Sequence, residues 1–463
     1  MTDFELAACS LNELTVMLRD GKVSSREITE ATLSALEHQD SKLNLIAGVD
    51  PEEALRQADA ADARRASGDA LGLLHGVPLA HKDMFYRKGR VSGGGSRILG
   101  EHPATVTATV LRRLDAAGAL DVARLNMVEF AYGLTGHNEI TGDVRNPWNP
   151  DHITGGSSSG PAAAVAAKCL AGALGSDTGG SIRFPASCCG LVGMKPTYGR
   201  VSRFGAMPLS HTLDHIGPLT RTVRDCALIT EVISGQDAQD PTSSHLPVPS
   251  MVPEHHEVAG MKIGVPTNYF AEVLDPEVQE CWDQDLKRFQ ALGCELVELV
   301  LPESFFVSNA MVNLVGAAES SAHHARWLRE RPQDYGAQTL RRLQSGLQVS
   351  AVDYLEGLNL RQVVLQDFLE QGMARVDALH VPVVPIPVPT LAESDIQANP
   401  GFIEYLSLLG HCTRPFDFLG VPALSIPAGQ TSNGLPCGMQ LVGRPFSEPL
   451  LFRLGLAHEE ALA

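Results

Sequence analysis

GGSSSGPAAAVAAKCLAGALGSDTGGSIR, residues 155–183, carries the strongest signal for the architecture of this chain. Two clusters of glycine and serine, residues 155–160 and 175–183, lie on either side of a run of small residues. That run, residues 161–168, predicts a helix that can pack closely beneath a site. One such cluster is typical of a flexible turn, but two clusters on either side of a helix indicate a built site.

From residue 75 to about residue 235, short apolar segments alternate with helix-like runs. The apolar segments are residues 77–80, 171–174 and 190–193, and the helical runs are residues 108–117 and 161–167. This alternation predicts an α/β fold, in which a mixed, twisted sheet is covered by helices on both faces.

Residues 1–70 are predicted to be helical. Ser24 and Glu27 form a capping box, and Asp50 precedes Pro51 at the start of a second helix. The C-terminal half predicts strands at residues 261–265, 294–300, 379–385, 423–427 and 438–442, with a helix opening at Asp275-Pro276 and another from Glu448.

Residues 236–257 are rich in Asp, Pro, Ser and His and predict an exposed connection. Because strands are predicted on both sides of it, one continuous sheet and two domains are both possible, and we favour one domain, 1–463. Its parts are a helical region 1–70, a core 71–235, the connection 236–260 and a variable helical region with the remaining strands, 261–463.

The composition limits the function. The chain has 36 basic and 54 acidic residues, a net charge of −18, and 44% hydrophobic residues. An acidic surface without a basic patch argues against direct binding to nucleic acid or to a membrane surface. The nine cysteines form no CxxC pair and no zinc spacing, which predicts free thiols, no metal and a cytoplasmic location. The N-terminus lacks the basic region of a signal peptide, and no apolar run is long enough to cross a bilayer.

The two glycine-serine clusters favour serine chemistry over nucleotide binding. Neither has the Lys-Ser/Thr ending of a P-loop, and neither matches GxGxxG after a strand. Successive backbone N–H groups at Thr178, Gly179, Gly180 and Ser181 can form a nest, because glycine adopts positive φ angles. Such a nest facing a serine hydroxyl is an oxyanion hole.

A rival interpretation is the nucleophile elbow GxSxG, formed by residues 156–160 with Ser158 as nucleophile and His411 or His458 as base. An elbow needs an apolar strand directly before it, whereas residues 146–152 form a polar loop broken by prolines. The elbow is therefore the weaker hypothesis.

A serine nucleophile also needs a base. The candidates in the first half of the chain are Lys82 and the histidines at positions 75, 81, 137, 152, 211 and 215. Lys82 follows an apolar strand, where burial would lower the pKa of its amine and leave it able to accept a proton. His81 would face the opposite side of that strand.

With these residues in place, the chain resembles the amidase signature family. That family carries a lysine, a Gly-Gly-Ser-Ser stretch and a Gly-Gly-Ser-Ile-Arg stretch in this order. The resemblance runs from about residue 71 to 222 and resumes near the C-terminus, at residues 420–427 and 435–440; within the first part it includes residues 194–203 and 213–218.

The resemblance implies a role for each matching residue. Ser181 would be the nucleophile, Ser157 a bridging serine held by a cis peptide bond, and Lys82 the base. The tetrahedral oxyanion would accept hydrogen bonds from the N–H groups of residues 178–181. Positions that we expect to support the loops are Ser158, Asp177 and Arg183. Positions that we expect to form substrate walls are Met84, Phe85, Tyr86, Gly155, Gly156, Phe402, Tyr405 and Phe416.

The resemblance leaves two functions open. The first is a free-standing hydrolase of small or aryl amides, with carbamates, urethanes and esters as further substrates. The second is the glutaminase subunit of a glutamine-dependent tRNA amidotransferase. Against the second, Phe184 stands where those subunits usually have Gln, and Gly410 stands at or near their acid for the glutamine amino group.

We favour the free-standing hydrolase, with an apolar substrate, because a buried ammonium would be left unpaired in such a pocket. No organic cofactor is implied. The expected partner is a small amide or carbamate, and the expected assembly is a monomer or homodimer.

Overall fold

The computed structural model describes residues 2–100, 102–397, 399 and 401–462. At its centre the described residues form one sheet of eleven strands, in the order β1-β3-β2-β4-β6-β5-β10-β11-β9-β7-β8. The strands are β1 (Ile46–Val49), β2 (Pro78–Lys82), β3 (Leu120–Leu125), β4 (Gly172–Asp177), β5 (Val192–Lys195), β6 (His215–Thr220), β7 (Lys262–Pro266), β8 (Glu295–Leu299), β9 (Ala378–Pro382), β10 (Ala423–Gln430) and β11 (Pro436–Val442).

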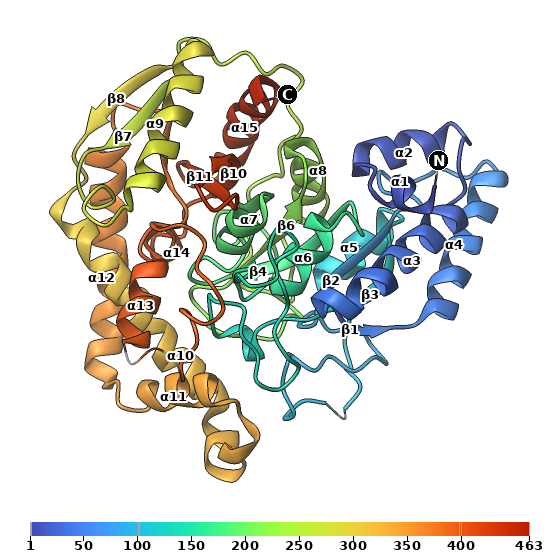
Figure 1. Cartoon of the computed structure of the whole chain (residues 1–463), viewed down its shortest axis with the longest axis horizontal. Coiled ribbons are helices and arrows are strands. Elements are labelled where there is room, and N and C mark those ends of the chain that lie inside the picture. Colours follow the sequence, from blue (N-terminus) through green and yellow to red (C-terminus); the bar gives the residue numbers. More distant parts are fainter. Residues whose placement is uncertain (1, 101, 398, 400, 463) are drawn as a thin grey trace.

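Helices from both halves of the chain pack around this sheet (Figure 1). They are α1 (Asp3–Ala7), α2 (Leu11–Arg19), α3 (Ser25–Leu43), α4 (Pro51–Ala66), α5 (Thr109–Ala116), α6 (Ser159–Ala166), α7 (Arg183–Cys189), α8 (Val223–Ile233), α9 (Pro276–Ala291), α10 (Ser308–Glu330), α11 (Ala337–Gly346), α12 (Ala351–Asp367), α13 (Phe402–Leu409), α14 (Arg414–Phe418) and α15 (Glu448–Leu462). In Figure 1, α1–α4 gather near β1 and β3, whereas α9 and α12 lie near β7 and β8 at the other end.

The sheet is mixed. β2 pairs in parallel with β3 and β4, and β7 pairs in parallel with β8 and β9, whereas the remaining pairs are antiparallel. Strands from before and after residues 236–260 join the same sheet, through the pairing of β5 with β10. This continuity confirms a single α/β domain.

Helices cover both faces of the sheet, as β4 shows. A Cβ on Gly172 would lie 2.8 Å from Ile229 of α8, and a Cβ on Gly175 would lie 2.6 Å from Ser158 at the start of α6. Positions three residues apart on a strand point to opposite faces. α8 and α6 therefore cover opposite faces of β4.

Local signals in the sequence predicted several helix starts. Ser24 and Glu27 form the expected capping box of α3, and Asp50 caps α4 with Pro51 in its first turn. Asp275 caps α9 in the same way. The predicted strands at 77–80, 171–174, 261–265, 294–300, 379–385, 423–427 and 438–442 correspond to β2, β4, β7, β8, β9, β10 and β11.

Two predictions need correction. Residues 1–70 are not only helical, because Ile46–Val49 forms β1 and pairs antiparallel with β3. The stretch 190–193 becomes a strand only from Val192, because Gly190 adopts a left-handed conformation that ends α7. The connection 236–257 contains no helix or strand, yet Asp240 and Met251 within it are buried.

All nine cysteines lie in the described part of the chain and are free. Among the described helices, none combines the length and the apolar character that a membrane span requires.

Candidate active site

The structure brings Lys82 and Ser157 together where the parallel strands β2 and β4 end. Lys82 is the last residue of β2 and is 1% exposed. Its Nζ donates hydrogen bonds to Ser157 Oγ at 2.7 Å and to Ser176 Oγ at 2.9 Å. The carboxyl ends of parallel strands are a common place for ligand sites in α/β sheets.

The position of Lys82 changes its acidity. Burial lowers the pKa of Lys82 to about 7, and the nearby carboxylates of Asp177 and Asp214 oppose this shift only in part. Removing an ammonium from water disfavours its charged form. A large fraction of Lys82 is therefore a neutral amine near pH 7.

Ser157 lies in the tight turn between residues 154 and 159. The Gly156–Ser157 peptide bond is cis, as the resemblance predicts. A side chain at Gly156 has no space, because its Cβ would lie 2.8 Å from Val128 and 2.9 Å from the backbone nitrogen of Gly136. Glycine at this position allows the turn that presents Ser157 to Lys82.

Ser158 occupies the N-cap position of α6 and is fully buried. Its Oγ accepts a hydrogen bond from the Ser176 N–H and donates one to the Ser176 carbonyl, both at 3.3 Å. The Ser158 hydroxyl therefore makes both of its hydrogen bonds with the backbone of β4. This placement removes Ser158 from the role that the nucleophile elbow would give it.

A buried carboxylate shapes the loop that contains Ser181. Asp177 Oδ1 accepts the Gly180 N–H at 2.7 Å, and Asp177 Oδ2 accepts the N–H groups of Ile182 at 3.1 Å and Arg183 at 3.2 Å. Burial raises the pKa of Asp177. The guanidinium of Arg183 lowers that pKa by more, and the pKa of the carboxyl therefore stays well below its usual range. An ionised Asp177 therefore holds the loop around Ser181.

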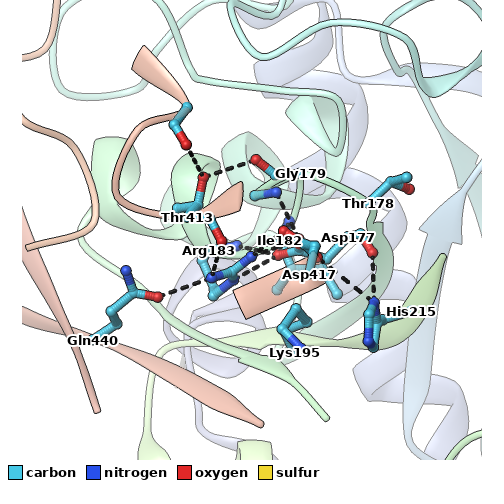
Figure 2. A network of polar contacts seen from close by, with 12 residues as sticks. Asp177, Thr178, Gly179, Ile182, Arg183, Lys195, His215, Thr413, Asp417 and Gln440 are labelled. Carbon is cyan, nitrogen blue, oxygen red and sulfur yellow. Dashed lines mark hydrogen bonds and ion pairs between the residues drawn. The ribbon is translucent and has the colours of Figure 1, made fainter. Parts of the chain in front are cut away.

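Arg183 connects this loop to the C-terminal part of the chain (Figure 2). It donates to both oxygens of Asp177 at 3.0 Å, and to Asp417 Oδ2 at 2.7 Å. It also donates to Gln440 Oε1 at 2.9 Å and to the Thr413 carbonyl at 3.0 Å. Every N–H group of the guanidinium donates to an acceptor inside the core. Arg183 therefore links the N-terminal and C-terminal halves of the chain rigidly.

The structure modifies the predicted oxyanion nest. Gly180 has φ +123, and its N–H donates to Asp177, so this group is not available to a substrate. Among the described residues, the N–H groups of Thr178, Gly179 and Ser181 have no acceptor. Three of the four predicted donors therefore remain, and all three residues line one cavity.

That cavity adjoins Ser181 and has a volume of about 50 Å³. Its walls include the loop residues Thr178 and Gly179 and two arginines, Arg342 of α11 and Arg414 of α14. The wall is therefore not as apolar as the sequence suggested. Phe184 does not line it, because its side chain is fully buried next to Gly155.

The predicted substrate-wall residues are dispersed. Phe402 and Phe416 are 0% exposed and belong to hydrophobic clusters of the core. Tyr405 is partly buried beside the Phe402 cluster. None of the three lines the cavity at Ser181.

The predicted substrate-wall residues Met84, Phe85 and Tyr86 do not line the cavity at Ser181 either. Met84 lines a second cavity of about 200 Å³, which Ser176 also lines. Phe85 is buried and contacts the ring of His81 edge to face. Tyr86 lines a third cavity, next to Trp327. Gly155 and Gly156 form the turn that precedes Ser157.

The histidine candidates make other contacts. The His81 ring receives a hydrogen bond from the Leu174 N–H on the adjacent strand, and burial lowers its pKa to about 4. His411 stacks on Tyr269, and His458 binds Asp285 at 2.6 Å. Three others contact backbone carbonyls or polar side chains outside the Ser181 loop: His75, His137 and His152. His215 Nδ1 lies 3.2 Å from the carbonyl oxygen of Asp177, where that loop begins. His211 lines the second cavity.

Two further residues near Lys82 and Ser181 were not identified from the sequence. Ser176 contacts Lys82 directly, and strand alternation could have found it, because β2 and β4 pair in parallel. Asp214 accepts a hydrogen bond from Thr178 Oγ1 at 2.6 Å. It lies just before β6, a strand that the sequence analysis did not predict.

Two more supporting residues come from the distant C-terminal part. Thr413 Oγ1 donates to the Gly179 carbonyl at 2.8 Å, which fixes the loop from the opposite side. Asp417 pairs with Arg183, while burial and the neighbouring charge of Asp177 raise the pKa of Asp417 well above the usual range.

Within the described residues no His, Cys, Asp and Glu side chains group as metal ligands.

Comparison with known proteins agrees with this arrangement. The profile of the Amidase family matches residues 27–452. The chain belongs to the amidase family. A relative from Geobacter metallireducens, named as the A subunit of a glutamyl-tRNA(Gln) amidotransferase, is 39% identical, over 99% of this chain and 98% of the relative.

Solved structures show the same fold. A bacterial aryl acylamidase of the amidase signature family superimposes with a TM-score of 0.87 at 29% identity, covering 98% of this chain and 96% of that one. A protein from a vestigial complex, described as revealing the origins of an s-triazine catabolic enzyme, gives 0.90 at 34% identity and covers 98% of both chains. This chain is an amidase, an enzyme that hydrolyses carboxylic amide C–N bonds.

Proposed function

We propose that this amidase forms an acyl-enzyme on Ser181, with Ser157 and Lys82 as its proton relay. The observation that carries the proposal is the 2.7 Å hydrogen bond between Lys82 Nζ and Ser157 Oγ, made by a buried lysine whose pKa is about 7. An amine with this pKa can accept a proton near neutral pH and return it in the next step.

The relay accounts for each proton. Ser181 Oγ attacks the amide carbonyl while its proton passes to Ser157 Oγ, and the Ser157 proton passes to neutral Lys82 Nζ. The oxyanion accepts hydrogen bonds from the free N–H groups of Thr178, Gly179 and Ser181. Lys82 then returns the proton through Ser157 to the leaving nitrogen, and the C–N bond breaks. Water attacks the acyl-enzyme by the same route, releasing the acid and restoring Ser181.

Protonation of the leaving nitrogen decides the reaction class. An amine leaves poorly unless it is protonated, so a relay that returns its proton suits amides. Carbamates and esters present a carbonyl group to the same nucleophile, and we include them as secondary substrates. The cavity volume of about 50 Å³ favours a short acyl group at Ser181.

A second candidate function is the glutaminase subunit of a tRNA amidotransferase. The relatives that carry this name, 36–40% identical over nearly the whole chain, support it. Against it, Phe184 fills core space beside Gly155, and Gly410 offers no carboxylate for a glutamine amino group. We therefore propose that the chain acts without such a partner.

The test compares the purified chain with Ser181→Ala on 4-nitroacetanilide and on small primary amides, following 4-nitroaniline or ammonia. Ser159→Ala is a matched control, because Ser159 Oγ is buried in the other glycine-serine cluster and is without a hydrogen-bond partner among the described residues. We expect loss of activity in Ser181→Ala and normal activity in Ser159→Ala. Full activity in Ser181→Ala would exclude Ser181 as nucleophile, and glutaminase activity only with an added partner would favour the second candidate.

A further inference from the structure

Two free thiols from distant segments of the chain lie side by side at the rim of the core. Cys281 belongs to α9 and is 7% exposed, and Cys437 belongs to β11 and is 6% exposed. Both pack in the same hydrophobic cluster. Cys281 Sγ lies 3.6 Å from the carbonyl oxygen of Gln430, an exposed residue of β10, so solvent is close to the pair. The proposed mechanism at Ser181 does not use these two thiols.

The pairing of β10 with β11 brings Cys437 beneath α9. Gly429 of β10 lies opposite Cys437, and a Cβ at Gly429 would lie 3.8 Å from Cys281 Sγ. Residues opposite each other on paired strands have their side chains on the same face of the sheet. The next residue of β11, Gly438, faces the other way, since a Cβ there would lie 2.6 Å from Ser187 Oγ of α7. Cys437 therefore points to the face where Cys281 lies.

Polar contacts hold α9 against the β10–β11 hairpin on both sides of this pair. In the first turn of α9, Glu277 accepts hydrogen bonds from the Ser432 N–H at 2.7 Å and from the Ser432 hydroxyl at 2.9 Å. In the last turn, Arg288 donates to the Ala428 carbonyl. Because these contacts fix the helix relative to the hairpin, a bond between the two sulfur atoms orders the folded chain little further.

The two thiols differ in acidity. A hydrogen bond from the Cys437 thiol lowers the pKa of Cys281, against the opposing effects of burial and of Glu280. Contact with Cys281 and burial raise the pKa of Cys437 well above its usual value. Burial also raises the pKa of the other cysteines, which are Cys9, Cys169, Cys188, Cys189, Cys226, Cys294 and Cys412. Cys281 is thus the thiol of this chain that ionises most readily, and the thiolate is the form that reacts with oxidants.

From this arrangement we propose that Cys281 and Cys437 are a redox pair, which hydrogen peroxide converts into a disulfide bond between α9 and β11. The Cys281 sulfur first attacks one peroxide oxygen, the O–O bond breaks, and the products are a sulfenic acid at Cys281 and one water. The Cys437 sulfur then attacks the sulfenic sulfur, and the S–S bond forms as the hydroxyl group leaves with the Cys437 proton as a second water. Two electrons pass from the two thiols to the peroxide, and a dithiol reverses the change.

The test exposes the reduced full chain to hydrogen peroxide at pH 7.5 and follows each cysteine with time. Catalase stops the reaction, and N-ethylmaleimide in urea blocks the remaining thiols. The chain is then digested without reductant and analysed by mass spectrometry. We expect the peptides of Cys281 and Cys437 to be recovered as one species, two hydrogens lighter than the separate peptides together, which dithiothreitol separates again.

Cys294 is the matched control within the same chain. Its exposure is 7%, equal to that of Cys281, whereas burial raises its pKa to about 11. At pH 7.5 a thiol of ordinary acidity has more than about 100-fold as much thiolate as Cys294, and the lower nucleophilicity of the more acidic thiolate reduces this advantage to about 10-fold. We therefore expect Cys281 to be oxidised about 10-fold faster than Cys294 or more, and Cys294→Ser to form the disulfide at the wild-type rate.

Variants separate the two steps. Cys437→Ser keeps a hydroxyl group that can donate a hydrogen bond to Cys281 but cannot form the S–S bond. The sulfenic acid should therefore accumulate at Cys281, where dimedone traps it. Cys281→Ser should leave Cys437 reduced. Oxidation should raise the urea midpoint of the wild-type chain, because the bond closes a long loop in the unfolded chain, and this rise should be absent from both variants.

Three results would overturn the redox pair. The first is joining of the two peptides only when the chain is oxidised in urea, since the thiols would then not meet in the folded chain. The second is oxidation of Cys294 as fast as that of Cys281. The third is a lower urea midpoint after oxidation, because the sulfur atoms would then have to leave their native positions to bond. The wild-type digest decides the question even if a variant does not fold, and no step of the test depends on the proposed hydrolase activity.

Discussion

The acidity of Lys82 predicts how the activity depends on pH. The proposed relay needs the neutral amine, and the pKa of Lys82 is about 7. At pH 6 about one-tenth of such an amine is neutral, and at pH 8 about nine-tenths. We therefore expect kcat/KM to rise about 10-fold between pH 6 and pH 8 and to level off above pH 8.

A charge variant identifies the titrating group. The carboxylates of Asp177 and Asp214 raise the pKa of Lys82 against the larger effect of burial. Asp214→Asn removes one of these charges while its amide oxygen can still accept a hydrogen bond from Thr178. The pKa of Lys82 then falls, more amine is neutral at low pH, and the rise of kcat/KM moves to lower pH.

The assay measures hydrolysis at substrate concentrations below KM from pH 5 to pH 9, with circular dichroism at each pH to confirm folding. Lys195 needs a control, because burial lowers its pKa to about 7 as well. Lys195→Gln should keep the midpoint of the profile if Lys82 is the base. A rate independent of pH across this range, or a midpoint above pH 9, would refute a neutral Lys82 as base.

Two further variants test the Ser181 loop. Gly180→Ala places a Cβ 2.4 Å from Thr413 Oγ1 at a residue with φ +123, and we expect it to lower the free energy of unfolding by about 2 kcal/mol or more in urea denaturation. Gly434→Ala is its control, since Gly434 also has a positive φ but no atom within 4 Å of the added Cβ. Asp177→Asn leaves the buried Arg183 with a weaker partner, and we expect a loss of about 3–5 kcal/mol together with lost activity; a stable and active variant would contradict the supporting role of Asp177.

The sequence predicted those features that depend on neighbouring residues. Helix starts at Ser24, Asp50 and Asp275 depend on capping within one turn, and each was predicted correctly. Burial of Lys82 followed from the apolar strand that precedes it. The short strand β1 was missed because only four residues form it, and its partner β3 is more than 70 residues away.

The sequence could not predict contacts between distant segments. Thr413 and Asp417 support the loop of Arg183 from more than 200 residues away, and only the order of strands in the sheet brings them there. The hydrogen bond from the Gly180 N–H to Asp177 could not be predicted for another reason. A run of four N–H groups suggests four donors, but the carboxylate at Asp177 takes one of them to hold the loop.

The residues around Ser181 therefore divide by function. The proposed relay and its supports are groups that the core holds rigidly, such as Lys82 on β2 and Arg183 in its buried network. The wall of the cavity beside Ser181 depends instead on distant segments: Arg342 comes from α11 and Arg414 from α14, and Gly410 leaves space for the Arg414 guanidinium. Overall similarity to the amidotransferase subunits agrees with shared amide chemistry, and the wall of this cavity is where we expect any difference in substrate to arise.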